Sequence, residues 1–99
     1  GFRTDFAGAS TTIAPENPVY AATVGKVARF QREYNGAQPG DPAKAAAAIL
    51  RVTSVDDPPL RLLLGSDAVR AADEATKARS EVDKKWRQLS ESTDFVART

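Results

Sequence analysis

Leu60-Arg61-Leu62-Leu63-Leu64-Gly65 is the stretch that decides how this 99-residue chain is interpreted. This short, nearly continuous apolar run follows Pro58-Pro59 and opens directly into a long helical pattern. An apolar run between turn signals predicts a β-strand over residues 60–64 that is buried on both faces, as in parallel sheets covered by helices. The rest of the sequence contains no second convincing strand, so the backbone of the predicted strand lacks a partner. We therefore expect that it pairs with another chain or that most of its sheet is missing.

The composition indicates one small globular domain and excludes several kinds of site. Hydrophobic residues make up 41% of the chain and charged residues 27%, and the net charge of +1 argues against a nucleic-acid surface. The absence of cysteine and histidine excludes disulfides and thiolate or imidazole metal ligands. No apolar run approaches the roughly 20 residues that cross a bilayer, and no signal peptide is visible. A cytoplasmic protein without a membrane partner is therefore predicted.

Helix start signals and apolar spacing predict three helices around the strand. An N-cap residue followed by proline occurs at Asn17-Pro18 and again at Asp41-Pro42. Ser66 is expected to cap a third helix, with Asp67 in its first turn. The predicted order is a loop over 1–17, helices over 18–35 and 42–54, the strand over 60–64, a long helix over 66–90 and a tail over 91–99.

Two charged clusters invite a functional interpretation that the sequence does not favour. Asp56-Asp57 precedes two prolines, which is typical of turn and capping residues rather than of a catalytic pair. Lys84-Lys85 and Arg87 are interleaved with acidic residues, which indicates a solvated helix face rather than a phosphate site. If the chain folds alone, its elements could collapse into a small bundle in which residues 60–64 are extended but unpaired. Its core would contain Tyr20, Val24, Val27, Ile49, Leu50, Leu62, Leu64, Val82 and Trp86.

Three stretches of the chain resemble the C-terminal part of the short-chain dehydrogenase/reductase family of NAD(P)-dependent oxidoreductases. They are Gly1-Phe2-Arg3-Thr4-Asp5-Phe6, Gly40-Asp41-Pro42-Ala43-Lys44-Ala45-Ala46 and Pro58-Pro59-Leu60-Arg61-Leu62-Leu63-Leu64-Gly65-Ser66-Asp67-Ala68. The resemblance implies a parent protein with an α/β, doubly wound parallel sheet of the Rossmann type. Leu60 to Leu64 would be its seventh and last strand, whereas this chain is itself mostly α, with a single strand.

The resemblance also implies a position for the cofactor and the substrate. If Pro-Gly precedes Gly1 in the parent, Thr4 matches the threonine of a Pro-Gly-x-x-x-Thr motif and approaches the nicotinamide carboxamide of NAD or NADP. The segment from Asp5 to about Phe30 would correspond to the mobile substrate-binding loop and its helix. Because the chain begins at Gly1 and contains no methionine, a natural start is not represented, and a fragment or a processed product is expected.

The motifs that carry the family's chemistry are missing from the chain. The glycine-rich dinucleotide loop is absent, as are the catalytic serine and the first six strands. Tyr-x-x-x-Lys is also absent, because Val24 stands four residues after Tyr20 and Gln38 four residues after Tyr34. That spacing lets the ammonium group lower the pKa of the phenol for proton transfer. We therefore predict no catalytic residue, no metal ligand, and no cofactor on the isolated chain.

Two functional hypotheses follow from different classes of protein. In the first, the chain is the substrate-loop and subunit-interface portion of an NAD(P)-dependent short-chain oxidoreductase, and its partner is the missing N-terminal part of that enzyme. In the second, it is a non-enzymatic helical module that assembles with identical chains through Leu60–Leu64. The second hypothesis predicts that an ordered chain is at least a dimer.

Overall fold

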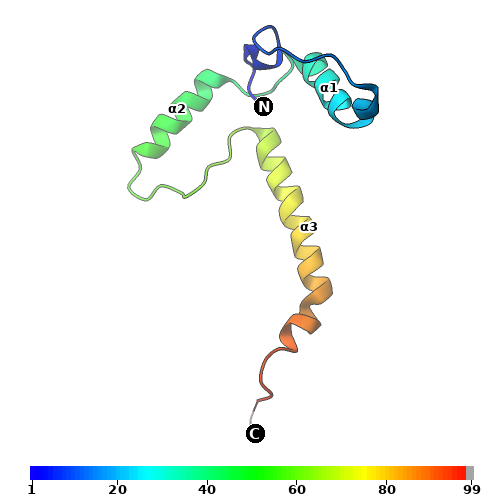
Figure 1. Cartoon of the computed structure of the whole chain (residues 1–99). Coiled ribbons are helices and arrows are strands. Elements are labelled where there is room, and N and C mark those ends of the chain that lie inside the picture. The colour runs from blue at the N-terminus through cyan, green and yellow to red at the C-terminus, as the bar shows by residue number, and fades with distance from the viewer. Residues whose placement is uncertain (98–99) are drawn as a thin grey trace.

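The structure is a computed structural model that describes residues 1–97, and it is an open arrangement of helices (Figure 1). Three α-helices are formed: α1 (Lys26–Tyr34), α2 (Pro42–Thr53) and α3 (Ser66–Glu91). Two 3₁₀ turns, Asp5–Ala7 and Pro18–Tyr20, and a π-helical turn, Ala21–Gly25, precede α1. In the described part of the chain, no helix is long and apolar enough to cross a membrane.

Side-chain caps explain where the early elements begin. The Asn17 carbonyl accepts a hydrogen bond of 3.0 Å from the N–H of Val19 at the start of the second 3₁₀ turn. Asp41 accepts from the N–H of Ala43 at 2.9 Å and caps α2. α3 differs from the expectation, because Ser66 is its first residue and Gly65 stands in the N-cap position without a side-chain bond. Gly65 has a φ of 98°, a left-handed conformation that favours glycine.

The segment predicted as one helix over 18–35 changes its winding along its length. It passes from a 3₁₀ turn through the π-helical turn Ala21–Gly25 and becomes α-helical only at Lys26. The wider π-helical turn ends at Gly25, where the side chain of Glu16 lies close to the helix backbone. Single π-helical turns are rare and often occur at functional sites.

The predicted strand over residues 60–64 is not formed. These residues have no regular secondary structure and connect α2 to α3 (Figure 1). Within residues 1–97 the β-pairing consists of one isolated parallel bridge between Phe2 and Gly40, where the N–H of Arg3 donates to the carbonyl of Gly40 at 2.8 Å. The physical reason is that a strand needs hydrogen bonds from a neighbouring strand, and none of the described residues supplies one.

The small bundle that the sequence allows is not formed among residues 1–97. The radius of gyration is 21.3 Å, whereas a compact chain of this length has about 13 Å. Among residues 1–97 no hydrophobic side chain is buried, and the buried residues are Gly8, Gly25 and Gln38. Leu64 is partly buried, and the other residues expected in the bundle are about half exposed or more: Tyr20, Val24, Val27, Ile49, Leu50, Leu62, Val82 and Trp86.

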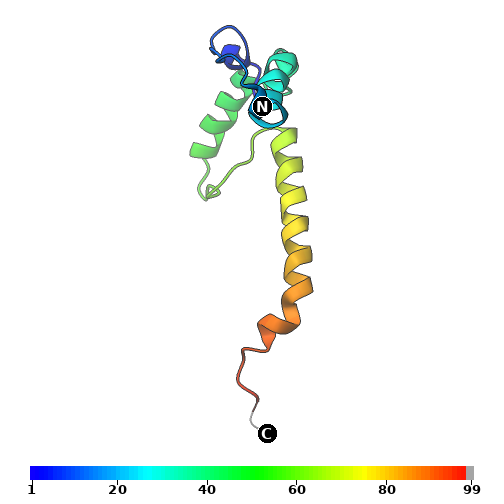
Figure 2. The ribbon, with the colours of Figure 1, turned by 45° about the vertical axis from the view of Figure 1, so that its right-hand side comes forward.

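Packing between elements is confined to the N-terminal part. Among the described elements, α1 contacts the π-helical turn and the first 3₁₀ turn, and the two turns before α1 contact each other. α2 and α3 project away from this part in both views of the ribbon (Figure 2). The N-terminal amino group of Gly1 pairs with the carboxylate of Asp67 at the start of α3. Residues 1–40 are therefore the part of the chain where a site can be assembled.

Candidate functional site

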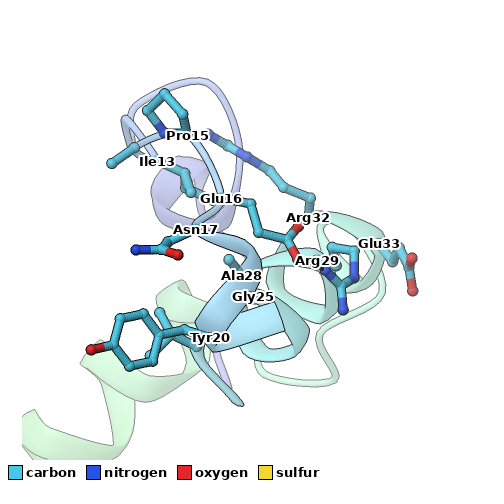
Figure 3. A pocket seen from close by; sticks show the side chains of 12 residues that line it. Ile13, Pro15, Glu16, Asn17, Tyr20, Gly25, Ala28, Arg29, Arg32 and Glu33 are labelled. Carbon is cyan, nitrogen blue, oxygen red and sulfur yellow. Dashed lines mark hydrogen bonds and ion pairs between the residues drawn. The ribbon is translucent and has the colours of Figure 1, made fainter. Parts of the chain in front are cut away.

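A pocket of about 620 Å³ lies between the loop that precedes Pro18 and the helical segment that follows it (Figure 3). Its walls are mostly apolar, with polar and charged side chains at the rim. The residues around it are Ile13, Ala14, Pro15, Glu16, Asn17, Tyr20, Val24, Gly25, Ala28, Arg29, Arg32 and Glu33. A volume of this size is within the range of small-molecule sites, about 300–1,000 Å³.

Arg29 connects α1 to the loop through an ion pair with Glu16. Its Nη1 lies 2.5 Å from Oε1 of Glu16, and its Nη2 donates to the carbonyl of Ala21 at 3.0 Å. The hydrogen bond and the negative charge of Glu16 raise the pKa of the Arg29 guanidinium above its ordinary value. Arg29 therefore stays protonated at every physiological pH, and its charge is compensated by Glu16.

Arg32 lies one turn further along α1, and its side chain binds backbone carbonyls of the preceding loop. Its Nη1 donates to the carbonyls of Ala7, at 3.2 Å, and Gly8, and its Nη2 donates to the carbonyl of Thr11 at 2.5 Å. A guanidinium group presents several N–H donors in one rigid plane, which suits such a cluster of carbonyls. The two arginines and their partners are called the arginine clamp below.

Two glycines allow the loop to approach α1 this closely. A Cβ atom on Gly25 would lie 2.6 Å from Oε1 of Glu16, and one on Gly8 would lie 2.8 Å from Nδ2 of Asn35. Both glycines are buried. A side chain at Gly25 would therefore displace the carboxylate that pairs with Arg29.

Thr4, the residue predicted to contact the cofactor, lies outside this pocket. Its Oγ1 accepts a hydrogen bond of 3.3 Å from the N–H of Phe6 and caps the first 3₁₀ turn. It borders a smaller hollow of about 340 Å³, together with Phe2, Phe6 and Gln38. The cofactor contact of Thr4 stays a prediction.

The sequence analysis did not select the residues of the arginine clamp. Arg29 and Arg32 stand three positions apart on α1, which places them on one face. That spacing is the signal by which the two arginines could have been found in the sequence. Their hydrogen-bond partners could not be found in this way, because they lie up to 25 residues away in the chain. Asp56 and Asp57 are exposed in the bend after α2, and no group of acidic residues in residues 1–97 is arranged to bind a metal ion.

Comparisons with known proteins find similarity to oxidoreductases over most of the chain. The sequence is 43% identical over 90 residues to "Oxidoreductase BOA17" of Botryotinia fuckeliana (strain B05.10), a match that covers 91% of this chain and 33% of the relative. The crystal structure of a short-chain dehydrogenase from Streptomyces avermitilis matches with a TM-score of 0.69 and 38% identity, over 94% of this chain and 34% of that one. No protein-family model matches.

The chain thus spans about one third of the length of the relatives that it matches. The structural relative is a short-chain dehydrogenase, the family expected from the stretches at Gly40–Ala46 and Pro58–Ala68. That family has a Rossmann-like α/β fold. The sequence match and the structural match agree that this chain is similar to one third of an oxidoreductase and of a short-chain dehydrogenase.

Proposed function

We propose that this chain is the substrate-loop and subunit-interface portion of an NAD(P)-dependent short-chain oxidoreductase, and that it transfers no hydride alone. The observation that carries the proposal is the match of 91% of the chain to one third of an oxidoreductase. It is supported by the lack of buried hydrophobic side chains among residues 1–97. Because apolar burial is the main favourable term in folding, such a segment is best explained as one part of a larger core.

The apolar surfaces of the C-terminal half would pack on the rest of the enzyme. Leu50 on α2, Leu60 in the connection and Val82 on α3 are 72%, 95% and 57% exposed. Burying one such side chain fully contributes about 1.5–3 kcal/mol, so several of them supply substantial binding free energy. With a neighbouring strand present, residues 60–64 would gain the hydrogen bonds that they lack in this chain.

The cofactor would be NAD or NADP, bound mainly by the rest of the enzyme. In this proposal Thr4 contacts the nicotinamide carboxamide, and its hydroxyl can both donate and accept a hydrogen bond. The position of Thr4 is supported by its place beside the hollow of about 340 Å³ near the Phe2–Gly40 bridge. The isolated chain would bind no cofactor and no metal ion, and the enzyme would act in the cytoplasm.

Self-association is a second candidate function, and the exposure of the connection favours it. Leu62 and Leu63 are 48% and 50% exposed, and the backbone between them is not paired with any strand of the described chain. Unpaired apolar segments of this kind are templates for pairing with another copy. In this second proposal identical chains associate through Leu60–Leu64 as a non-enzymatic assembly module.

A chimaera distinguishes the two proposals. This chain would replace the homologous third of the Streptomyces avermitilis short-chain dehydrogenase, and NADH and NADPH binding would be followed by fluorescence. We expect the chimaera to bind one of them and to unfold cooperatively, and we expect the isolated chain to bind neither. Micromolar binding of a dinucleotide to the isolated chain would contradict the first proposal, as would a chimaera that forms no cooperative core.

A further inference from the structure

We infer that the pocket of residues 13–33 takes an uncharged, largely apolar substrate, because the cationic groups around it are used by the chain itself. The inference rests on the proposed function for the statement that the ligand is a substrate. The charge and polarity of the pocket, however, follow from contacts within this chain.

The charges around the pocket balance each other. Arg29 and Arg32 contribute two positive charges, and Glu16 and Glu33 contribute two negative ones. Arg29 lies 2.5 Å from Glu16, and the charge of Glu33 also raises the pKa of Arg29. A carboxylate ligand would therefore compete with Glu16 for its natural counter-ion.

Arg32 is a positioning residue, because its donors are directed at the loop rather than at the pocket. It donates to the carbonyls of Ala7, Gly8 and Thr11, which belong to the segment before the pocket. An anion that recruited Arg32 would have to replace these hydrogen bonds and would release the loop. The geometry thus disfavours anionic ligands at both arginines.

The remaining surface of the pocket suits an apolar molecule with one or two neutral polar groups. Ile13 and Pro15 supply aliphatic surface, and Tyr20 supplies an aromatic ring (Figure 3). Val24 also lines the pocket. Asn17 and Tyr20 are the uncharged polar residues among those that line the pocket. Sites of this kind bind by apolar contact and are oriented by a few polar groups.

The test compares two probes of similar size that differ in charge, 4-phenylbutan-2-one and 4-phenylbutanoate. Each is titrated into the ¹⁵N-labelled full chain, and the amide shifts of Val24 and Ala28 report binding. We expect the ketone to bind about tenfold more tightly or better, since the carboxylate must displace a hydrogen bond to a charged group. Equal or tighter binding of the carboxylate would overturn the inference, and so would the failure of the ketone to saturate these shifts at millimolar concentration.

A charge variant then tests whether the pairing of Glu16 with Arg29 is what weakens the binding of carboxylates. Glu16→Gln keeps a hydrogen-bond acceptor but leaves the charge of Arg29 uncompensated. The affinity for 4-phenylbutanoate should therefore rise about two- to fivefold, which is the factor that the free energy of an exposed ion pair corresponds to. Glu74→Gln, an equal change of charge at an exposed position of α3, should leave both affinities unchanged. An unchanged carboxylate affinity in Glu16→Gln would overturn the charge argument.

These results are independent of the proposed function. The probe titrations use no dinucleotide, so they report on the pocket whether or not the chimaera binds NADH or NADPH. If the chimaera fails and the ketone binds selectively, the pocket is apolar and uncharged but its ligand is not the substrate of such an oxidoreductase. If the chimaera binds cofactor and the carboxylate is preferred, the proposed function stands and the substrate class is wrong.

Discussion

Residues 1–40 and residues 41–97 reach their conformations by different physical means. The first region is held by hydrogen bonds between distant residues, such as Arg32 to Gly8 and Arg3 to the carbonyl of Gln38 at 3.0 Å. In the described part of the second region, the regular secondary structure consists of α2 and α3. Neither helix packs on another described element. Polar bonds can shape a loop locally, but an amphipathic helix gains most of its stability from packing its apolar face.

The difference explains why both regions depend on a larger assembly in different ways. The first region contains the arginine clamp and the pocket, but it has no apolar surface of another element to pack against. The second region brings the apolar surface, with Leu50, Leu60 and Trp86 about half exposed or more, and it lacks the groups that would cover this surface. If the two regions have the proposed roles, the substrate loop is shaped before the core is complete, whereas the interface is not.

The largest expected effect is a change in the second region, Leu62→Lys in the chimaera. A lysine buried at the predicted strand would place an unpaired charge in an apolar core, and we expect a loss of about 3 kcal/mol or more in the free energy of unfolding. Urea unfolding followed by circular dichroism measures this loss. The matched control is Arg61→Lys, the neighbouring residue, which keeps the charge and should change stability little. An unaffected Leu62→Lys chimaera would show that residues 60–64 do not enter the core.

A smaller effect is expected in the first region when the clamp is removed by Arg32→Ala. Three hydrogen bonds from a charged donor to loop carbonyls are lost, so the local free energy of opening should fall by about 1.5–3 kcal/mol. Hydrogen exchange of residues 7–13 in the full chain measures this local opening. Arg32→Lys should restore part of the protection, because an ammonium group cannot reach all three carbonyls at once.

The control for the clamp is Arg51→Ala on α2, which removes an equal charge from an exposed helix position. Exchange of the loop should stay the same in that variant. If Arg51→Ala and Arg32→Ala accelerate exchange equally, net charge rather than the clamp determines the order of the loop.

Thr4→Val in the chimaera sharpens the comparison further, since it removes the contact that Thr4 is proposed to make with the cofactor. Loss of one neutral hydrogen bond should raise the Kd for the bound dinucleotide about fivefold. Thr4→Ser, which keeps the hydroxyl that caps the first 3₁₀ turn, should bind nearly as well as the unchanged chimaera. Equal Kd values for Thr4→Val and the unchanged chimaera would remove Thr4 from the proposed cofactor site.

The sequence allowed the family to be predicted, and the comparisons confirm it, because the stretch from Pro58 to Ala68 is specific in its order of residues. Capping signals are also readable, since Asp41 and the N–H of Ala43 that it accepts from are two residues apart. The clamp was missed because Arg32 and the carbonyl of Gly8 are 24 residues apart, and no local pattern connects them. The strand predicted at residues 60–64 is not formed, because no segment of residues 1–97 lies beside it to supply the hydrogen bonds that a strand needs.

The smallest expected effect concerns the ion pair that links the two regions, between the amino group of Gly1 and Asp67. The hydrogen bond from this amino group, followed by the bond from the N–H of Ala68, lowers the pKa of Asp67 below its ordinary value of 3.8. A lowered pKa means that the pair stabilises the arrangement above that ordinary value and that its contribution is lost as the pH falls through the lowered pKa. Because the side chain of Asp67 is 28% exposed and its partner is a chain terminus, the effect on global unfolding should be small, and a ¹³C titration of its carboxyl group is the appropriate experiment. Acetylation of the amino group should move the pKa back toward the ordinary value. If acetylation leaves the pKa unchanged, this ion pair does not link the two regions.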